Sequence, residues 1–503
     1  MRFFWPLLLF PVLAPAGTAL PGTLNGELSL QRSIGIAVQR NLDLRLERIG
    51  TIDAREAIEE ALAPFDPALT ANLGYNKQRS PEAGSDLDGA DQPENNSTDL
   101  TTSLSKTFAP GTEVSLNGTL YDRSETNSSF ARINPEFNNR FALEVRQPLL
   151  AGGGKTVTLA PLRLAGLAAE RADLNTIAEL NRVLRATEDA YWDVVAAAAR
   201  LEIRRQSRNL SKLIVEETEG RQAAELMTRV DVLEARAALA ESDEQVIVAE
   251  SASRDAADAL FQVMGILLES RPGALLLDPL PQDSPTVPDA TTVFARALET
   301  APEARALDSQ IRSRELDLAV ARRNRLPRLD ATFGTGALGR DGEASGSYSR
   351  AASADGFFWE AGVEVRVPWG LRAERAGARR AAAALESARL DRKQADLALL
   401  TEIRAACREI SLADQQVYAA TTTAELNRLR FQQRREERLA GLSTLRDTIE
   451  AEEEAEAAEL RILEARVSRQ KAAARLAALE GALPARYGID IPDAISPESI
   501  PQP

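Results

Sequence analysis

The fold is decided by one stretch in the second half of the chain, FFWEAGVEVRVP at residues 357–368. Its odd positions are all apolar, whereas Glu360, Glu364 and Arg366 lie among the even positions. Successive side chains of a β-strand point to opposite faces of its sheet. The stretch is therefore predicted to be a strand with one apolar face and one charged face.

Two kinds of structure would explain such a strand. Its apolar face could be half-buried on the protein's own core, or it could face lipid in a transmembrane barrel whose lumen the charged face lines. Similar alternation occurs in the first half of the chain, at residues 99–108, 113–120 and 140–146. The alternation alone does not choose between the two structures.

The second half of the chain repeats the pattern of the first. EVRQP at residues 144–148 matches EVRVP at residues 364–368, an offset of 220 residues. Upstream, a helical stretch leads to Pro67 in the first half and to Pro327 in the second, an offset of 260 residues. The first half therefore carries 40 additional residues between its two prolines. They are predicted to form either a longer loop or an additional hairpin.

Each half is predicted to end in a hairpin of two very long helices. Proline, which breaks helices, is absent between Pro161 and Pro272 and between Pro368 and Pro484. Apolar and small residues spaced alternately by four and three mark a coiled-coil seam in both hairpins. In the first helix the seam runs through Leu180, Leu184, Thr187, Tyr191, Val194, Ala198 and Leu201.

The first residues have the parts of an export signal. Arg2 precedes an apolar run from Phe3 to Ala14, and small residues follow as far as Ala19. The run is interrupted by prolines and is too short to span a bilayer. No later segment is apolar enough for a membrane helix, so a membrane-spanning mature protein would have to use strands.

These features predict five segments. They are a signal peptide at 1–19, a first repeat at 28–266 with its strand region at about 68–148, a Pro-rich linker at 267–290, a second repeat at 291–481 with its strand region at about 328–368, and a Pro-rich C-terminal tail at 482–503.

Composition narrows the function. The 503 residues include 60 basic and 75 acidic side chains, a formal charge of −15, which speaks against a nucleic-acid partner. Histidine is absent, which excludes His-based catalysis and His metal sites, and the single cysteine, Cys407, excludes an intramolecular disulfide. We therefore expect neither an enzyme nor a cofactor, and we interpret Cys407 as a packing residue.

Counting strands predicts self-association. Two core strands per repeat would give four per chain, too few to close a barrel without a free edge, and lipid does not tolerate open edges. Three copies would supply twelve strands to a barrel. They would also supply twelve long helices, enough to wall a hollow cylinder.

In these features the chain resembles the TolC-like outer-membrane factor family, over nearly the whole mature sequence. The resemblance rests on the duplicated halves, the helix-to-strand corners at Pro67 and Pro327, and QPLL at residues 147–150. It also rests on AYW at residues 190–192 and on the matching segments LMTRVDVLEA, residues 226–235, and GLSTLRD, residues 441–447.

The resemblance implies a mainly α-helical protein with a membrane β-barrel. Three copies would share a 12-stranded barrel in outer-membrane lipid, continued across the periplasm by an α-helical coiled-coil tunnel. The implied function is the exit duct of a tripartite efflux pump or a type I secretion system. The implied partners are a periplasmic adaptor and an inner-membrane pump or ABC exporter.

The resemblance also implies roles for residues at the periplasmic tip. Asp447 and Glu450 match acidic residues that narrow the pore entrance and favour cations. A structural role is open beside this one, because Thr444 and Asp447, like Thr228 and Asp231, have the spacing of a helix capping box.

The remaining tip residues are expected to hold the closed state or to bind the adaptor. Asp231 would join an inter-helix network, with Arg438 or Arg446 as its partner. Gly441 and Leu442 match the adaptor-docking turn, and Leu226 is the equivalent of Leu442 in the first repeat. The family's latch is not reproduced, because Ser443 and Arg438 stand where relatives have Arg and Tyr.

A different class of function stays open at this point. The chain could be a periplasmic coiled-coil structural or adaptor protein without a pore. The sequence also does not distinguish efflux of small molecules from secretion of polypeptides.

Overall fold

The computed structural model describes residues 27–81, 90, 92–267, 276–281 and 288–490. The predicted signal peptide, and parts of the predicted linker and tail, lie outside these residues. The chain forms two compact units, which are treated separately below. The sheet unit comprises the described residues within 43–181, 289–404 and 479–503, and the hairpin unit those within 1–42, 182–288 and 405–478.

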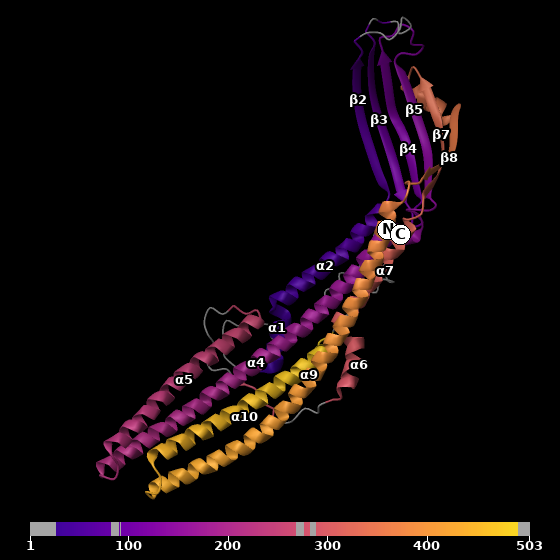
Figure 1. Cartoon of the computed structure of the whole chain (residues 1–503). Coiled ribbons are helices and arrows are strands. Elements are labelled where there is room, and N and C mark those ends of the chain that lie inside the picture. Colours follow the sequence, from indigo (N-terminus) through magenta and orange to yellow (C-terminus); the bar gives the residue numbers. More distant parts are fainter. Residues whose placement is uncertain (1–26, 82–89, 91, 268–275, 282–287, 491–503) are drawn as a thin grey trace. The chain divides into compact units, whose positions relative to one another are not determined.

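The sheet unit contains one antiparallel sheet of six strands, in the order β2-β3-β4-β5-β7-β8 (Figure 1). The strands are β2 (Ala68–Arg79), β3 (Glu94–Thr107), β4 (Glu113–Thr126), β5 (Glu136–Pro148), β7 (Arg328–Asp341) and β8 (Gly356–Arg366). The strand predicted from residues 357–368 is β8, and the equivalent strand in the first repeat is β5.

The predicted alternation extends across all six strands. One row of directly opposed residues, the centre of what we call the apolar face, consists of Leu69, Leu104, Leu116, Leu143, Thr335 and Trp359. The adjacent row on the other side, the polar face, consists of Ala68, Ser105, Ser115, Glu144, Gly334 and Glu360. Leu69 and Trp359 are 74% and 69% exposed, so the described residues leave much of the apolar face uncovered.

The prediction of two core strands per repeat is wrong for the first repeat. The 40 additional residues contribute the hairpin β3–β4, which lies between β2 and β5. Among the described residues, the first repeat therefore supplies four strands of this sheet and the second repeat two. The strand pattern of residues 99–120 was visible in the sequence, but periodicity does not say which strands are neighbours. The alternative of a longer loop is thereby excluded.

A short helix, α8 (Ala344–Ala352), lies against β7 and β5 near the β7–β8 connection. The Ser347 hydroxyl donates to Asn139 Oδ1 at 2.7 Å, and both side chains are buried. Gly339 has no space for a side chain, because a Cβ atom there would lie 1.8 Å from the Ser347 carbonyl oxygen. The helix therefore covers the end of the apolar face that lies toward the β7–β8 connection.

The strands connect to helices at the opposite end of the sheet. The sheet unit contains α2 (Leu42–Leu62), the 3-10 turn η1 (Ala63–Phe65), α3 (Lys155–Thr158), α6 (Ala290–Thr300), α7 (Pro302–Arg323) and α11 (Leu483–Arg486). It also contains the first parts of the long helices α4 (Ala160–Ala223) and α9 (Arg372–Leu439). Ile58, Phe65 and Leu162 belong to the apolar cluster that packs α2 and η1 on α4.

The hairpin unit holds the second parts of α4 and α9 together with α1 (Leu30–Arg40), α5 (Arg229–Val263) and α10 (Leu445–Leu479). The predicted long helices are thus confirmed, and the seam residues Leu184, Thr187 and Tyr191 are fully buried. The Tyr191 hydroxyl contacts the Leu28 carbonyl and the Asp278 carboxylate, each at 3.0 Å, beside the short parallel pair β1 (Glu27–Leu28) and β6 (Leu276–Leu277). Cys407 is buried, in agreement with a packing role.

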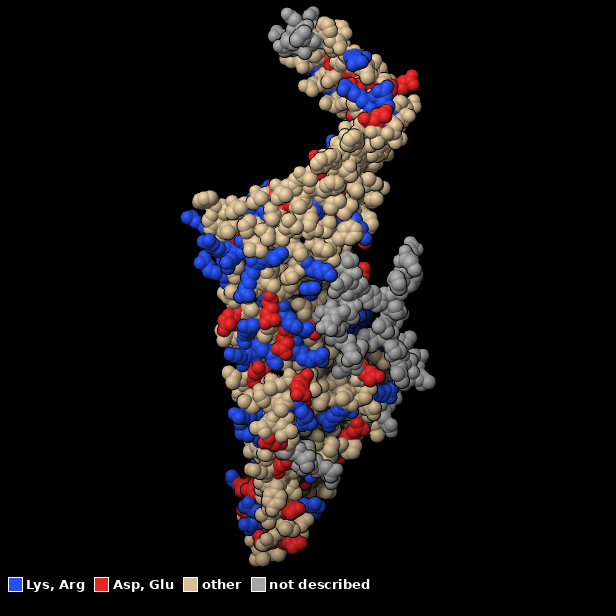
Figure 2. Space-filling model, turned by 90° about the vertical axis from the view of Figure 1, so that its right-hand side faces the viewer, with Lys and Arg blue, Asp and Glu red and all other residues tan. Residues whose placement is uncertain are grey.

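Charge is unevenly distributed between strands and helices. Figure 2 shows one face of the molecule on which charged side chains are sparse over the strands and dense over the helices.

Among the described residues, no helix is both long and apolar enough to cross a bilayer.

A charge on the apolar face should block membrane assembly. Val363 lies on that face of β8 and is 67% exposed. Val363→Arg is expected to cost about 2–4 kcal/mol if the residue faces the bilayer midplane. The amount of protein assembled in the outer membrane, measured by heat-modifiable gel mobility, should therefore fall sharply. Glu360→Arg, on the polar face of the same strand, is the matched control and should assemble normally; equal yields would contradict the assignment of the faces.

Candidate functional site at the helical tips

The two helical hairpins turn through closely related backbone geometry. The α4–α5 turn places Glu225 at φ 59°, and the α9–α10 turn places Gly441 at φ 77°. In each, the next N–H, that of Leu226 or Leu442, bonds back to a carbonyl five residues earlier at 2.9 or 2.8 Å. This is the Schellman arrangement that ends a helix. Glu225 adopts the left-handed conformation that glycine provides in the second repeat.

The helix after each turn starts with a capping box. Asp231 Oδ2 accepts from the Thr228 N–H at 2.8 Å, and the Thr228 hydroxyl oxygen accepts from the Asp231 N–H at 3.2 Å. Thr444 and Asp447 make the same reciprocal pair, at 3.0 and 3.1 Å. The capping role predicted for these acids is therefore present in both repeats.

Capping does not neutralise Asp447. Hydrogen bonds from the Thr444 side chain and N–H, and from the Ser443 hydroxyl, lower the pKa of the Asp447 carboxyl. The group therefore stays ionised at neutral pH. Glu450 lies one turn further along α10 and accepts from Arg446 Nε at 2.9 Å, in an exposed ion pair.

The structure does not pair Asp231 with Arg438 or Arg446. Arg438 is only 1% exposed and donates to Glu217 Oε2 of α4 at 2.8 Å, whereas Arg446 pairs with Glu450. Asp231 is instead engaged in its own cap. Within one chain the two arginines therefore pair with other carboxylates, and the network that joins Asp231 to another helix stays a prediction.

Two further residues connect the hairpins near their turns. Arg221 of α4 donates to the carbonyls of Arg438 and Leu439 at 3.2 and 2.9 Å, the last carbonyls of α9. With the Arg438–Glu217 pair, this makes two polar links between α4 and α9. Sequence reasoning missed Glu217 and Arg221, because the repeat relates equivalent positions of the two hairpins but does not say which side chains face each other.

The predicted docking residues are exposed at the turns. Leu226 is 73% and Leu442 80% exposed. A Cβ atom built on Gly441 would meet no atom within 4 Å. The two turns thus present apolar side chains and open backbone to the surroundings.

A buried acidic pair lies behind the second tip. Glu452 of α10 is 7% exposed and accepts a short hydrogen bond from the Ser207 hydroxyl of α4. Glu456, one turn along, pairs with Arg204 at 2.8 Å. Burial raises the pKa of the Glu452 carboxyl to about 7; the Ser207 hydrogen bond opposes this shift, and the charge of Glu456 adds to it. The described residues contain no group of three or more Cys, Asp or Glu arranged to hold a metal ion.

This architecture, a sheet with an exposed apolar face joined to helical hairpins, is also found in outer-membrane channels of known structure. The fold is shared with the outer-membrane channel OprN (TM-score 0.68, 18% identity, 90% of each chain). It is shared with the Campylobacter jejuni CmeC outer membrane channel (0.68, 14%, 93% of this chain and 87% of that one). The open state of the Neisseria gonorrhoeae MtrE outer membrane channel is also similar (0.61, 17%, 90% and 89%).

A family model matches part of the sequence. Residues 293–482 match the family model described as outer membrane efflux protein. No curated protein matches the chain. The resemblance to the TolC-like outer-membrane factors is confirmed by the family match and the shared fold. The matched family is that of outer membrane efflux proteins, and the shared fold is that of outer-membrane channels.

The buried Glu452 should make the packing of α10 on α4 sensitive to pH. Its folded-state pKa is raised, so its contribution is fully present below the ordinary value of 4.5 and is lost as the pH rises to about 7. The loss above pH 7 is on the order of 3 kcal/mol. Glu452→Gln should therefore slow amide exchange in α10 at pH 8 and remove most of its pH dependence.

Hydrogen exchange, corrected for its intrinsic pH dependence, measures this effect. Glu459→Gln, an exposed position on the same helix, is the control and should leave the profile unchanged. An unchanged profile in Glu452→Gln would show that this carboxyl does not titrate in the neutral range.

Proposed function

We propose that the chain works as a homotrimer, the outer-membrane exit duct of a tripartite efflux pump. The observation that carries this proposal is the incomplete wall. Among the described residues, the sheet has two free edges, β2 and β8, and an exposed apolar face, so this part of one chain does not enclose a pore. The family match to outer membrane efflux proteins favours efflux over type I secretion.

The partners we propose are a periplasmic adaptor and an inner-membrane pump or ABC exporter. The support lies in the two turns, where Leu226, Gly441 and Leu442 offer an apolar, open surface. Apolar side chains exposed beside open backbone are suited to the close approach of another helical hairpin. The pump would select the cargo, small molecules or polypeptides, and the duct would pass it.

We also propose that Asp447 and Glu450 set the ion preference of the periplasmic entrance. Three copies would bring six carboxylates to the constriction and create a negative field that favours cations. Support comes from the hydrogen bonds that keep Asp447 ionised. A periplasmic coiled-coil protein without a pore is the alternative function, and conductance separates the two.

Planar bilayers test the duct and its selectivity together. The purified protein should conduct ions and prefer cations, and the double variant Asp447→Asn with Glu450→Gln should move the reversal potential toward zero. Thr444→Ala weakens the cap but keeps both carboxylates, so it controls for loss of structure. Absence of conductance would support the non-channel alternative, and an unchanged reversal potential would remove the acidic ring.

Adaptor capture tests the docking surface. Leu226→Ser with Leu442→Ser should weaken binding of the cognate adaptor about tenfold or more, because two exposed apolar contacts of about 1–2 kcal/mol would be lost. Leu267→Ser, 96% exposed beyond the other end of α5, is the matched control. Crosslinking yield and drug efflux are the readouts; normal capture by the double variant would place docking elsewhere.

A further inference from the structure

The hairpin β3–β4 has the dimensions of a membrane-spanning element. Each of its strands has 14 residues, as many as β7 and one more than β5. A transmembrane strand needs about 9–11 residues. In Figure 1 the two strands lie within the sheet, between β2 and β5, and not over one of its faces.

The side chains of this hairpin follow the same two faces as the rest of the sheet. Leu104 and Leu116 oppose each other on the apolar face, and Leu116 opposes Leu143 of β5. Ser105 and Ser115 oppose each other on the polar face. A hairpin that projected from the wall would have no reason to keep this register with both neighbours.

The helix-side end of the hairpin is fixed to the rest of the sheet unit. The Pro110 carbonyl accepts from the N–H of Gly154, the residue just before α3, at 3.0 Å. Gly111 adopts φ 89°, and a Cβ atom there would lie 2.8 Å from Thr158 Oγ1. The tight turn between β3 and β4 therefore requires glycine at position 111.

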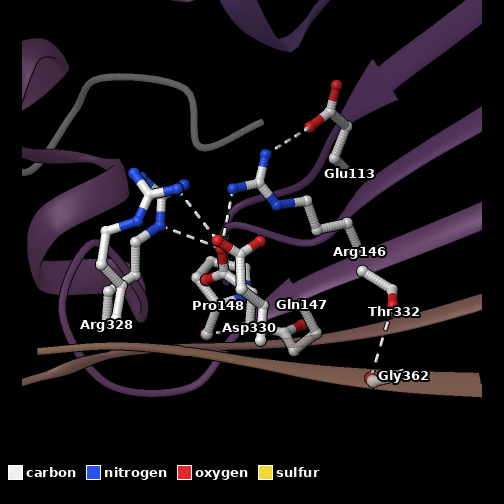
Figure 3. Close-up of polar contacts among 10 residues, drawn as sticks. Glu113, Arg146, Gln147, Pro148, Arg328, Asp330, Thr332 and Gly362 are labelled. Atoms are coloured by element: carbon white, nitrogen blue, oxygen red, sulfur yellow. Dashed lines mark hydrogen bonds and ion pairs between the residues drawn. The ribbon is translucent and has the colours of Figure 1, made fainter.

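Charged side chains join the hairpin to the strands beyond it. Arg146 of β5 contacts Glu113 of β4 at 4.0 Å and donates to Asp330 of β7 at 2.7 Å (Figure 3). Arg328 approaches the same carboxylate at 2.9 Å, and Asp330 is 1% exposed. One guanidinium thus bridges the inserted hairpin and the second repeat.

Inserting two strands leaves the connections of the sheet unchanged. β2 runs antiparallel to β3 and β4 antiparallel to β5, so β2 and β5 keep opposite directions with or without the hairpin. The edges of the sheet remain β2 and β8. A copy of the chain can therefore join the next copy through the same two edges.

We propose that all six strands of the antiparallel sheet, β2 to β5 with β7 and β8, form the barrel wall in each chain. Three copies then close an eighteen-stranded barrel. This rests on the proposed trimer and revises the twelve strands that the resemblance implies. Because barrel diameter grows roughly linearly with strand number, the lumen is about one and a half times as wide as a twelve-stranded one. The hairpin therefore sets the width of the exit.

Engineered cysteine pairs distinguish the two walls in the assembled trimer. In a Cys407→Ala background, the pair Leu69→Cys with Leu104→Cys and the pair Leu116→Cys with Leu143→Cys should each form an intrachain disulfide under a membrane-permeant oxidant. These residues oppose each other directly in the sheet. The third pair, Leu69→Cys with Leu143→Cys, should not link, because two strands separate its members. Linking of the third pair in place of the first two would overturn the proposal.

Removing the hairpin measures its effect on the lumen. Excision of residues 94–126 removes β3 and β4. It joins the β2–β3 connection to the β4–β5 connection, which lies at the same end of the sheet, and leaves four strands in the sheet of each chain. Labelling of Glu144→Cys, on the polar face, by polyethylene-glycol maleimides of graded size should then show a cut-off diameter lower by about one third. An unchanged cut-off would contradict the wide barrel.

The disulfide pairs decide the question even if the excised variant does not assemble. A chain that never trimerises would defeat the proposed duct, but the intrachain links would still report whether β3 and β4 pair with β2 and β5. The two proposals therefore fail separately.

Discussion

The two edge strands, β2 and β8, each present backbone N–H and C=O groups that no other strand of the described chain pairs. In lipid, where water does not reach them, each such group costs several kcal/mol. A single sheet with two such edges would therefore leave these backbone groups unpaired in a bilayer. In the proposed trimer, these edges pair with the edges of neighbouring copies.

The need to pair buried polar groups also explains the contacts at the helical tips. Burying Arg438 is costly unless a carboxylate accompanies it, and Glu217 supplies that carboxylate from the neighbouring helix. The last carbonyls of α9 are satisfied by Arg221, and the first N–H groups of α5 and α10 by Thr228 and Thr444. These contacts hold the turns in one conformation, and an opening of the tip that separates α4 from α9 would have to replace them.

Local patterns in the sequence predicted local structure well. The alternation at residues 357–368 gave β8, and the seam through Tyr191 gave α4. The additional hairpin was seen as strands but not placed, because pairing depends on partners that periodicity does not identify. The Arg438–Glu217 pair was missed for the same reason. The short helix α8 was also missed, since ASGSYSRAA at residues 344–352 offers no strong helical signal and is held by Asn139 and Gly339.

In the sequence, only Asp447 of the two acids has the spacing of a capping residue, so a structural role explains Glu450 less well; the contacts reverse that order. The carboxylate of Glu450 is paired with the guanidinium of Arg446, so much of its field is cancelled nearby. The hydrogen-bond partners of Asp447, Thr444 and Ser443, are neutral, and Arg434 and Arg446 act on it only through their charges, without a hydrogen bond. The negative charge of Asp447 partly offsets the positive end of the α10 helix dipole. Of the two carboxylates, that of Asp447 is nevertheless neutralised less by nearby positive charge than that of Glu450. It follows that Asp447 should contribute most of any cation preference.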